Sequence, residues 1–492
     1  MPSSAEHYHQ ATKYDPATIG NHPGMDWSAK PTLHKEYANA QEFGVDDLSL
    51  GEHLETELPR PKAQRARLMR LLYCSYGITA MLESNDGESH ALRSAPSAGG
   101  LYPCELYVLL RDGFDIPKGL YNYHAGRNVL QLVRAIEDDA VFDALWTALP
   151  RGAAEFSADF IVFVSTVFYR SSWRYLERGY RRCLLDSGHL VGNLLVAADA
   201  DELELLPLSG FLDELVNDLL GLSEKDEGVL AVLLGSFSNA EASPKVSRAL
   251  KGSTLAPSFE PSPEDLLQAM VQETGLKRAD FAMARVSSPP SATHTGFDKN
   301  YAFGKAYTSE AETDLSQRIV QAMLARRSGR RYTGEPITFM QLMNMLRFAY
   351  QRCDACFAPD LLHSYLVVHN VQGLAQGLYA YSDADHTLYL IEEGDFRNQL
   401  MHLSLGQQIA ALSSCVLIHT VDLAQAVQRF GNRAYRTIHL DAGAIGQRLA
   451  IGANAQGFTT CGIGGFFDDD VNRLLTIREN HICAYLTTIG RE

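Results

Sequence analysis

The chain has 492 residues, of which 46% are hydrophobic and 21% are charged, and its formal net charge is −16. This length predicts two or more domains, and the apolar fraction excludes a wholly disordered or collagen-like chain. The acidic balance argues against nucleic-acid binding, which needs a basic surface, but it leaves room for one basic pocket that holds a phosphorylated cofactor.

Membrane and metal sites are not expected either. No uninterrupted apolar run approaches the roughly 18 residues of a membrane span. The polar start, residues 1–15, lacks the order of a signal peptide. These features predict a cytoplasmic protein with no membrane partner. The only CxxC pattern, Cys353 to Cys356, has no second pair or nearby His at metal-ligand spacing, so we expect no metal site.

The same succession of elements is expected in each half of the chain. Helical spacing of apolar residues is followed by strands, a long buried helix and a final strand. Long helices mixed with few strands indicate an α+β fold. The predicted elements are helix 68–78, strands 105–110 and 160–167, helix 184–198 and strand 230–234, and then helix 338–350, strands 364–369 and 415–420, helix 440–453 and strand 484–489.

One block of sequence occurs twice. Residues 174–188 match residues 429–443 without a gap, at an offset of 255 residues, and residues 119–123 resemble residues 377–381. Matches in the same order along the chain predict a tandem duplication. The expected domains are 1–240 and 306–492, joined by a Ser/Pro-rich linker, 241–305, that holds one short helix.

The first half carries a turn rich in small residues, Pro96-Ser-Ala-Gly-Gly100. Two Gly and a flanking Pro give a rigid turn with exposed backbone N–H groups, which lets a planar ligand approach the backbone closely. The alternative is a strand-entry turn that binds nothing.

The second half carries a basic segment, Arg326-Arg-Ser-Gly-Arg-Arg331, after a predicted helix. Arg offers planar, forked donors that match phosphate, and Ser adds a hydroxyl donor. The alternative is a solvated helix end that the helix dipole favours. A third candidate is Gly462-Ile-Gly-Gly-Phe466, whose backbone N–H groups could face a ligand, although it is not a dinucleotide-binding GxGxxG.

Taken together, these segments resemble the nitroreductase superfamily of FMN-dependent oxidoreductases, and within it the SagB/ThcOx-type dehydrogenases, which oxidise azolines to azoles in peptide natural products. The resemblance covers nearly the whole chain apart from the linker. The segments that carry it are 8–13, 93–103, 119–123, 178–189, 326–330 and 462–466.

The resemblance implies a site shared between two subunits. In the family, FMN lies between the subunits of a homodimer. The Arg-rich segment of one subunit holds the phosphate, and the Pro-Ser turn of the other covers the ring. Here each half has only one of the two, so we expect tandem nitroreductase-like folds that form an intramolecular pseudo-dimer with one FMN per chain. The residues expected to contact FMN are Arg326, Arg327, Ser328, Arg330, Arg491, Pro96, Ser97, Ala98, Gly99, Gln407, Gly464 and Gly465.

Tyr175 is the expected catalytic residue. The azole-forming members carry a Lys-Tyr pair where this chain has Arg174-Tyr175. Lys can shift its pKa and act as a base, whereas Arg effectively cannot. Azoline oxidation by that route is therefore not implied. The Tyr175 hydroxyl can still donate or accept a proton, and the alternative is a packed aromatic ring. Asp186 and His189 are expected to serve structure.

Three functions remain open at this point. The first is an FMN-dependent dehydrogenase that transfers a hydride between a small molecule or peptide and flavin N5. The second is a nitro- or quinone-reductase with NAD(P)H as electron donor. The third is a non-catalytic flavoprotein partner in a biosynthetic cluster. The fused halves would allow the chain to work as a monomer, and higher assembly stays open.

Overall fold

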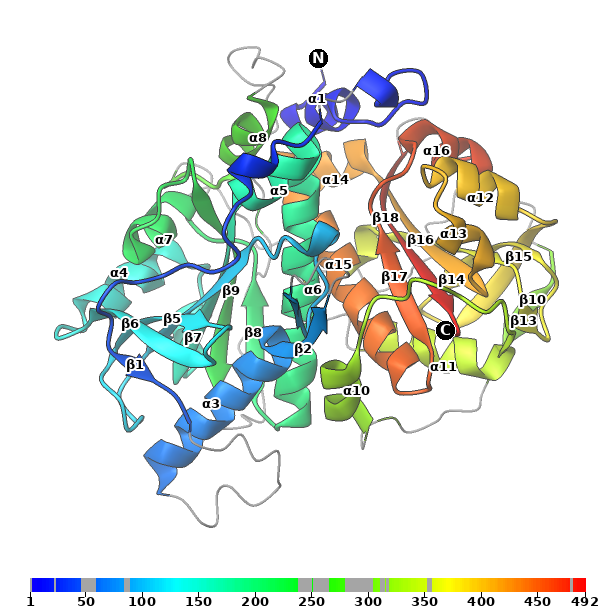
Figure 1. Ribbon diagram of the computed structural model, residues 1–492. Helices are drawn as coiled ribbons and strands as arrows, with labels where there is room; N and C mark the ends of the chain where they lie inside the picture. Colours follow the sequence, from blue (N-terminus) through cyan, green and yellow to red (C-terminus); the bar gives the residue numbers. More distant parts are fainter. Residues whose placement is uncertain are drawn as a thin grey trace.

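The protein consists of two similar halves that lie side by side, with two long helices, α6 (Gly179–Ala200) and α15 (Ala434–Asn454), between their sheets (Figure 1). The α+β prediction is confirmed. The computed structural model describes residues 2–21, 24–45, 59–83, 89–237, 250, 265–278, 304–309, 315, 318–351, 356–477 and 481–492.

Each half contains a seven-stranded antiparallel sheet with the same strand order. In the first half the order is β1 (Glu42–Phe43), β6 (Val129–Ala135), β5 (Gly119–His124), β4 (Cys104–Leu110), β7 (Phe160–Val167), β9 (Glu227–Ser236) and β8 (Glu204–Leu208). In the second half it is β10 (Ala306–Thr308), β15 (Thr387–Glu393), β14 (Gly377–Ser382), β12 (His363–Val368), β16 (Cys415–Asp422), β18 (His481–Gly490) and β17 (Thr459–Ile463). The duplication therefore extends over the whole fold.

Helices cover the sheets and meet at the junction of the halves (Figure 1). Helix α11 (Phe339–Tyr350) begins where the sequence predicts, because Thr338 and Gln341 form a capping box. Helix α3 (Arg60–Tyr76) begins eight residues before the predicted start. The other helices and short strands are α4 (Ala140–Ala148), α5 (Phe168–Tyr175), α7 (Asp213–Leu220), α10 (Ile319–Ala325), α12 (Arg397–Leu403), α13 (Gln408–Leu412), α14 (Leu423–Phe430), α16 (Asp468–Leu475), β2 (Ile78–Glu83), β3 (Ser89–Arg93), β11 (Ile337–Thr338) and β13 (Val371–Gln372).

Helices α6 and α15 touch each other through glycine. The Cα atom of Gly443 lies 3.0 Å from the position that a Cβ atom would take on Gly188, and the reverse distance is also 3.0 Å. Any side chain at either position would collide with the facing backbone. The two glycines match each other at the offset of 255, so equivalent positions meet, as they do across the two-fold axis of a homodimer. The halves therefore pair as two subunits would.

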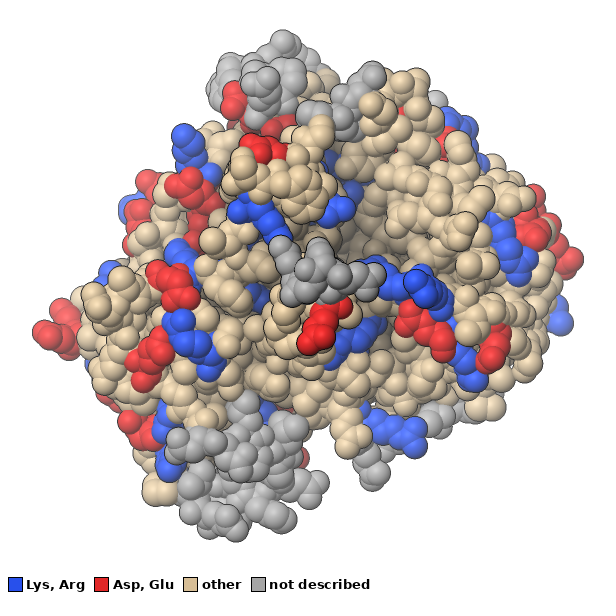
Figure 2. Space-filling view, in the orientation of Figure 1, with Lys and Arg blue, Asp and Glu red and all other residues tan. Residues whose placement is uncertain are grey.

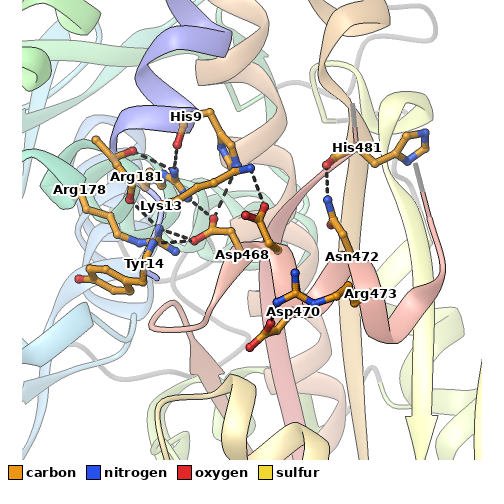
Figure 3. Close-up of polar contacts among 12 residues, drawn as sticks. His9, Lys13, Tyr14, Arg178, Arg181, Asp468, Asp470, Asn472, Arg473 and His481 are labelled. Carbon is orange, nitrogen blue, oxygen red and sulfur yellow. Dashed lines mark hydrogen bonds and ion pairs between the residues drawn. The ribbon is translucent and has the colours of Figure 1, made fainter. Parts of the chain in front are cut away.

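Two buried ion clusters fasten the halves together. Asp468 accepts from Nη1 of Arg178 and Nη1 of Arg181, each at 2.7 Å (Figure 3). The counterpart Asp213 pairs with Arg433 at 2.6 Å and Arg436 at 2.5 Å. In each cluster the carboxylate comes from one half and both guanidinium groups come from the other.

The charge of Asp468 is stabilised by its partners. Burial alone would raise the pKa of its carboxyl, but Arg178 and Arg181 hold that pKa well below its usual range. The backbone N–H of Tyr14 adds a hydrogen bond of 3.1 Å to the same carboxylate. Asp468 therefore stays ionised in the interior.

The helix expected in the linker is α8 (Leu266–Thr274), and it is docked between the halves. Thr274 accepts hydrogen bonds from Arg433 to its carbonyl oxygen (2.8 Å) and from Arg436 to its hydroxyl (3.1 Å). In the same way, Thr12 at the end of α1 (Ser4–Ala11) accepts from the first-half arginines. Helix α8 therefore contacts the arginines of the second half in the same way that α1 contacts those of the first half.

None of the helices in the described part of the chain is long and apolar enough to cross a membrane.

Replacing Asp468 by Asn should destabilise the protein strongly, because Arg178 and Arg181 would remain buried without a carboxylate. We expect the free energy of unfolding, measured by urea denaturation, to fall by about 3–5 kcal/mol. The matched control is Asp469→Asn, since Asp469 is 53% exposed and pairs with Lys13 at 2.7 Å. That surface pair should cost less than about 1 kcal/mol. Equally small losses in both variants would contradict this role of Asp468.

Candidate functional site

The basic segment of the second half reaches the Pro-Ser turn region of the first half. Arg326, which directly follows α10, is 5% exposed. Its Nε donates to the carbonyl oxygen of Ser94 at 2.7 Å, and its Nη2 donates to that of Arg93 at 3.3 Å. Burial lowers the pKa of Arg326 to about 10, so the group stays charged at neutral pH. The basic segment of the second half therefore contacts the first half two residues before the Pro-Ser turn.

The rest of the segment runs beside β17. Ser328 forms a parallel bridge with Thr460, and Nη1 of Arg330 lies 3.5 Å from Sγ of Cys461. Arg327 turns to the first half and donates to the carbonyl oxygen of Thr79 at 2.8 Å. In Figure 2, Lys and Arg side chains lie on both sides of the junction between the halves.

The backbone of this segment already holds an anionic group. Oε1 of Glu492 accepts from the N–H of Arg330 and, at 2.9 Å, from the N–H of Arg331. Adjacent N–H groups with nearby guanidinium groups are the donor set that a phosphate requires. The residues present therefore fit a phosphorylated ligand.

The Pro-Ser turn is held by a carboxylate of α6. Asp186 Oδ2 accepts from Ser97 Oγ at 2.6 Å, and both its oxygens accept from the N–H of Ala98 at 3.2 Å. Gly99 has φ +66°, which favours glycine. Pro96, Ser97 and Ala98 are half-buried, and Gly99 is exposed. The turn thus presents its backbone at the junction.

Gly464 and Gly465 follow the end of β17. Nε2 of Gln407 donates to the carbonyl oxygen of Gly465 at 3.3 Å, so Gln407 lies beside the glycine pair. A Cβ atom on Gly464 would collide with the guanidinium of Arg182 from the first half. The structure therefore brings the glycine segment, like the Arg segment, against the first half.

Tyr175 lies against the Pro-Ser turn and is connected to the glycine segment through Arg182. Its hydroxyl oxygen is 2.9 Å from the position of a Cβ atom on Gly99, and the Arg182 guanidinium lies over its ring at 5.1 Å. Burial raises the pKa of Tyr175, while Arg182 and Arg174 act in the opposite direction. The phenol is therefore protonated at neutral pH.

Comparisons with known proteins agree with this arrangement. The model of the nitroreductase family matches residues 61–236 and 323–491, once in each half. A putative nitroreductase of known structure from Anabaena variabilis ATCC 29413 is 36% identical, with 100% of both chains covered and a TM-score of 0.87. The chain belongs to the nitroreductase family. As a member, it is an FMN-dependent oxidoreductase that contains the family fold twice.

Two curated relatives match parts of this nitroreductase-family chain. A putative nitroreductase of Methanocaldococcus jannaschii is 26% identical over 183 residues, which cover 36% of this chain and 91% of the relative. The microcin B17-processing protein McbC of Escherichia coli is 28% identical over 147 residues, which cover 28% of this chain and 52% of McbC.

In the nitroreductase pseudo-dimer, the residues that match Gly464 and Gly465 are packed against other parts of the chain. Ser209 stands where the other side has Gly464, and its carbonyl oxygen accepts from Nε of Arg433 at 2.5 Å. Leu250 packs on the neighbouring Gly210, with its backbone N 2.9 Å from the position of a Cβ atom there.

In the second half, the segment that corresponds to the Pro-Ser turn lacks the Pro-Ser sequence but is still held by an aspartate. Asp441, which matches Asp186 at the offset of 255, accepts from the N–H groups of Phe357 (2.9 Å) and Ala358 (2.7 Å). The carboxylate that positions the turn is thus retained on both sides, while the Pro-Ser sequence is present on one.

The remaining predicted residues have structural contacts. Arg491 pairs with Glu335 at 3.2 Å, and its guanidinium lies over the ring of Phe458 at 5.2 Å. His189 joins the halves through Gln447 (2.9 Å) and Tyr485 (2.8 Å). No group of three or more His, Cys, Asp or Glu able to hold a metal ion occurs among the residues that the structure describes. Cys353 lies outside those residues.

Two features of the site were missed from the sequence. The offset of 255 also pairs Asp213 with Asp468, which gave a signal for the interface clusters. The same offset places Arg182 opposite Thr437, although several neighbouring positions in this block have the same residue in both halves. This difference was a signal that the position has a different role in each half.

Titration of Asp186 should make the stability of the protein depend on pH. Burial raises the pKa of Asp186 to about 7, above the ordinary value near 4, and the hydrogen bonds from Ser97 and Ala98 only partly oppose this. Between about pH 4 and pH 7, the folded state keeps a proton that the unfolded state loses. The contribution of Asp186 to the free energy of unfolding therefore falls as pH rises through that window.

Asp186→Asn cannot titrate, so its stability relative to the parent protein should rise between pH 5 and pH 7, by at most about 1.4 kcal/mol per pH unit, and level off above. Urea denaturation at several pH values measures this difference. Asp143→Asn, at an exposed position of α4, is the control. A difference between Asp186→Asn and the parent that is constant with pH would contradict the expectation.

Proposed function

We propose that this chain binds one FMN at the junction of its halves and transfers a hydride between an organic substrate and flavin N5, as SagB/ThcOx-type dehydrogenases do. The observation that carries the proposal is the contact of Arg326 in the second half with Ser94, next to the Pro-Ser turn of the first half. The similarity to McbC supports the choice of a dehydrogenase.

Each side of the junction has a separate task in this proposal. The basic segment of the second half holds the phosphate through guanidinium groups and backbone N–H groups, while the Pro-Ser turn of the first half and the glycine segment of the second half contact the ring. The residues assigned to the phosphate and its surroundings are Arg326, Arg327, Ser328, Arg330 and Arg491. Those assigned to the ring are Pro96, Ser97, Ala98, Gly99, Gln407, Gly464 and Gly465.

When bound, FMN supplies an N5 atom that accepts or gives a hydride. The backbone N–H of Gly464 would direct a hydrogen bond to the ring edge, a preorganised dipole that stabilises developing charge. Tyr175 would hold a proton at its hydroxyl group, because burial keeps the phenol neutral. Since Arg174 replaces the Lys of the azole-forming members, we do not assign azoline oxidation. The substrate class is a small molecule or peptide.

Flavin binding can be tested at two adjacent arginines. Both residues are exposed, and the guanidinium of Arg330 contacts Cys461 on β17. The flavin-to-chain ratio, measured by absorbance, should be near one in the parent protein. Arg330→Ala should weaken FMN binding by about tenfold or more, because a charged hydrogen bond to phosphate is lost. Arg331→Ala is the matched control and should bind FMN as the parent does.

A ratio near two would show that the equivalent place on the other side of the pseudo-dimer also binds flavin, and would overturn the single-site proposal. Undiminished binding in Arg330→Ala would remove that residue from the phosphate site.

An NAD(P)H-dependent reductase is the second candidate, and the relatives described as putative nitroreductases favour it. Anaerobic mixing with NADPH separates the two. The dehydrogenase is expected to show slow bleaching of the flavin absorbance by NADPH and faster bleaching by its own substrate. Bleaching by NADPH within the mixing time would support the reductase instead.

A further inference from the structure

Arg182 is a buried cation that stacks on the ring of Tyr175 but has no hydrogen-bonded acceptor among the described residues. It lies in the first turns of α6 and is 4% exposed. Within the part of the chain that is described, its guanidinium forms no hydrogen bond and no ion pair. The other buried arginines there all have acceptors: Arg93, Arg170, Arg178, Arg181, Arg326, Arg433, Arg436 and Arg448. A guanidinium whose donors have no acceptor can receive an anion that is brought to it.

Arg182 lies at the place where the proposed function puts the reacting end of the flavin. Its Nη1 is directly against Gly464, at the strand end assigned to flavin N5, and its guanidinium covers the ring of Tyr175 at 5.1 Å. The hydroxyl of Tyr175 in turn faces Gly99 of the Pro-Ser turn. Arg182 therefore lies where residues from both halves converge.

Nearby carboxylates do not account for the cation. Asp186 is one helical turn away, and Arg182 lowers the pKa of its carboxyl, but burial raises that pKa more, to about 7, and the carboxylate oxygens accept from Ser97 and Ala98 rather than from Arg182. Asp468 is paired with Arg178 and Arg181. No carboxylate in the described part of the chain forms an ion pair with Arg182, so a ligand can supply the anion.

The flavin phosphate is not a suitable anion. The phosphate end of the site is marked by Arg330, which contacts Cys461. Gly464 is three residues further along the chain, or about 10 Å at the rise of an extended strand. Arg182 is thus at the ring end, where the substrate must approach.

The duplicated half provides an internal comparison. The position that matches Arg182 is Thr437, whose hydroxyl donates to the carbonyl oxygen of Arg433 at 3.3 Å. Its side of the pseudo-dimer is the one where Leu250 packs on Gly210. The arginine is thus present on the side that keeps the glycine segment and the Pro-Ser turn.

We propose that Arg182 binds a carboxylate of the substrate, so that the chain acts on organic acids, including peptides or amino-acid derivatives with a free carboxylate. A guanidinium can hold a carboxylate through two parallel N–H···O bonds, which fixes its orientation as well as its position. This proposal rests on the proposed function, because it places the substrate next to a flavin at the junction.

The test compares benzoate with benzamide, which has nearly the same shape but no charge. Titrated into the parent holoprotein, benzoate should perturb the flavin absorbance with a Kd at least about tenfold lower than that of benzamide. Arg182→Met should abolish the preference for benzoate, and Arg182→Lys should retain part of it. Arg473→Met, at an exposed arginine of α16, is the control and should keep the full preference.

The flavin-to-chain ratio of each variant separates the two proposals. Loss of the benzoate preference with flavin content unchanged supports Arg182 as a substrate-binding residue. Equal affinity of the parent for benzoate and benzamide overturns it, as does an Arg182→Met variant that keeps the preference. If the parent protein bound no flavin, the proposed function would fail. Thermal stabilisation by benzoate relative to benzamide, in the parent and in Arg182→Met, would then still decide whether Arg182 binds a carboxylate.

Discussion

The whole arrangement depends on the close approach of α6 and α15. With glycine at positions 188 and 443, the helix backbones touch, and this contact fixes how far apart the halves lie and how they are rotated. The buried clusters around Asp468 and Asp213 can form only at that separation, because each joins a carboxylate of one half to guanidinium groups of the other. The same geometry carries Arg326 to the carbonyl oxygen of Ser94. A greater distance between α6 and α15 would break the ion clusters and would also separate the two halves of the site.

Much of the fold could be predicted from sequence, because buried elements leave a clear pattern. Strand β7 has the predicted bounds, 160–167, since a segment rich in Val, Ile and Phe is typical of a buried strand. Helix α3 begins earlier than predicted because its first turns, with Pro61, Ala63 and Gln64, carry no apolar stripe. Strands β6 and β15, each second from the edge of its sheet, were missed for a related reason, since they are only partly buried. The docking of α8 depends on Arg433 and Arg436, which are far away in the chain.

The features of the candidate site also fall into two groups, those that local sequence predicts and those that depend on residues far apart in the chain. The Pro-Ser turn and the Arg-rich segment are local patterns, so the sequence was enough to name them and to predict that each belongs to a different half. The environment of Arg182 is not local, because it depends on Gly464 from the other half of the chain. The packing of Leu250 on Gly210 could not be predicted either, since no local pattern indicates which backbone Leu250 meets.

The covalent joining of the halves has a consequence for how such a protein can change. In a homodimer every mutation appears twice, once on each side of the symmetry axis, so a residue that helps one site must be tolerated at the other. Here Arg182 and Thr437 are independent positions, and so are Gly464 and Ser209. Mutations on one side of the pseudo-dimer can improve ligand binding, while mutations on the other side fill the equivalent space with packed side chains. Because the halves are fused, the two sides of the interface can accumulate different mutations, which the symmetry of a homodimer does not allow.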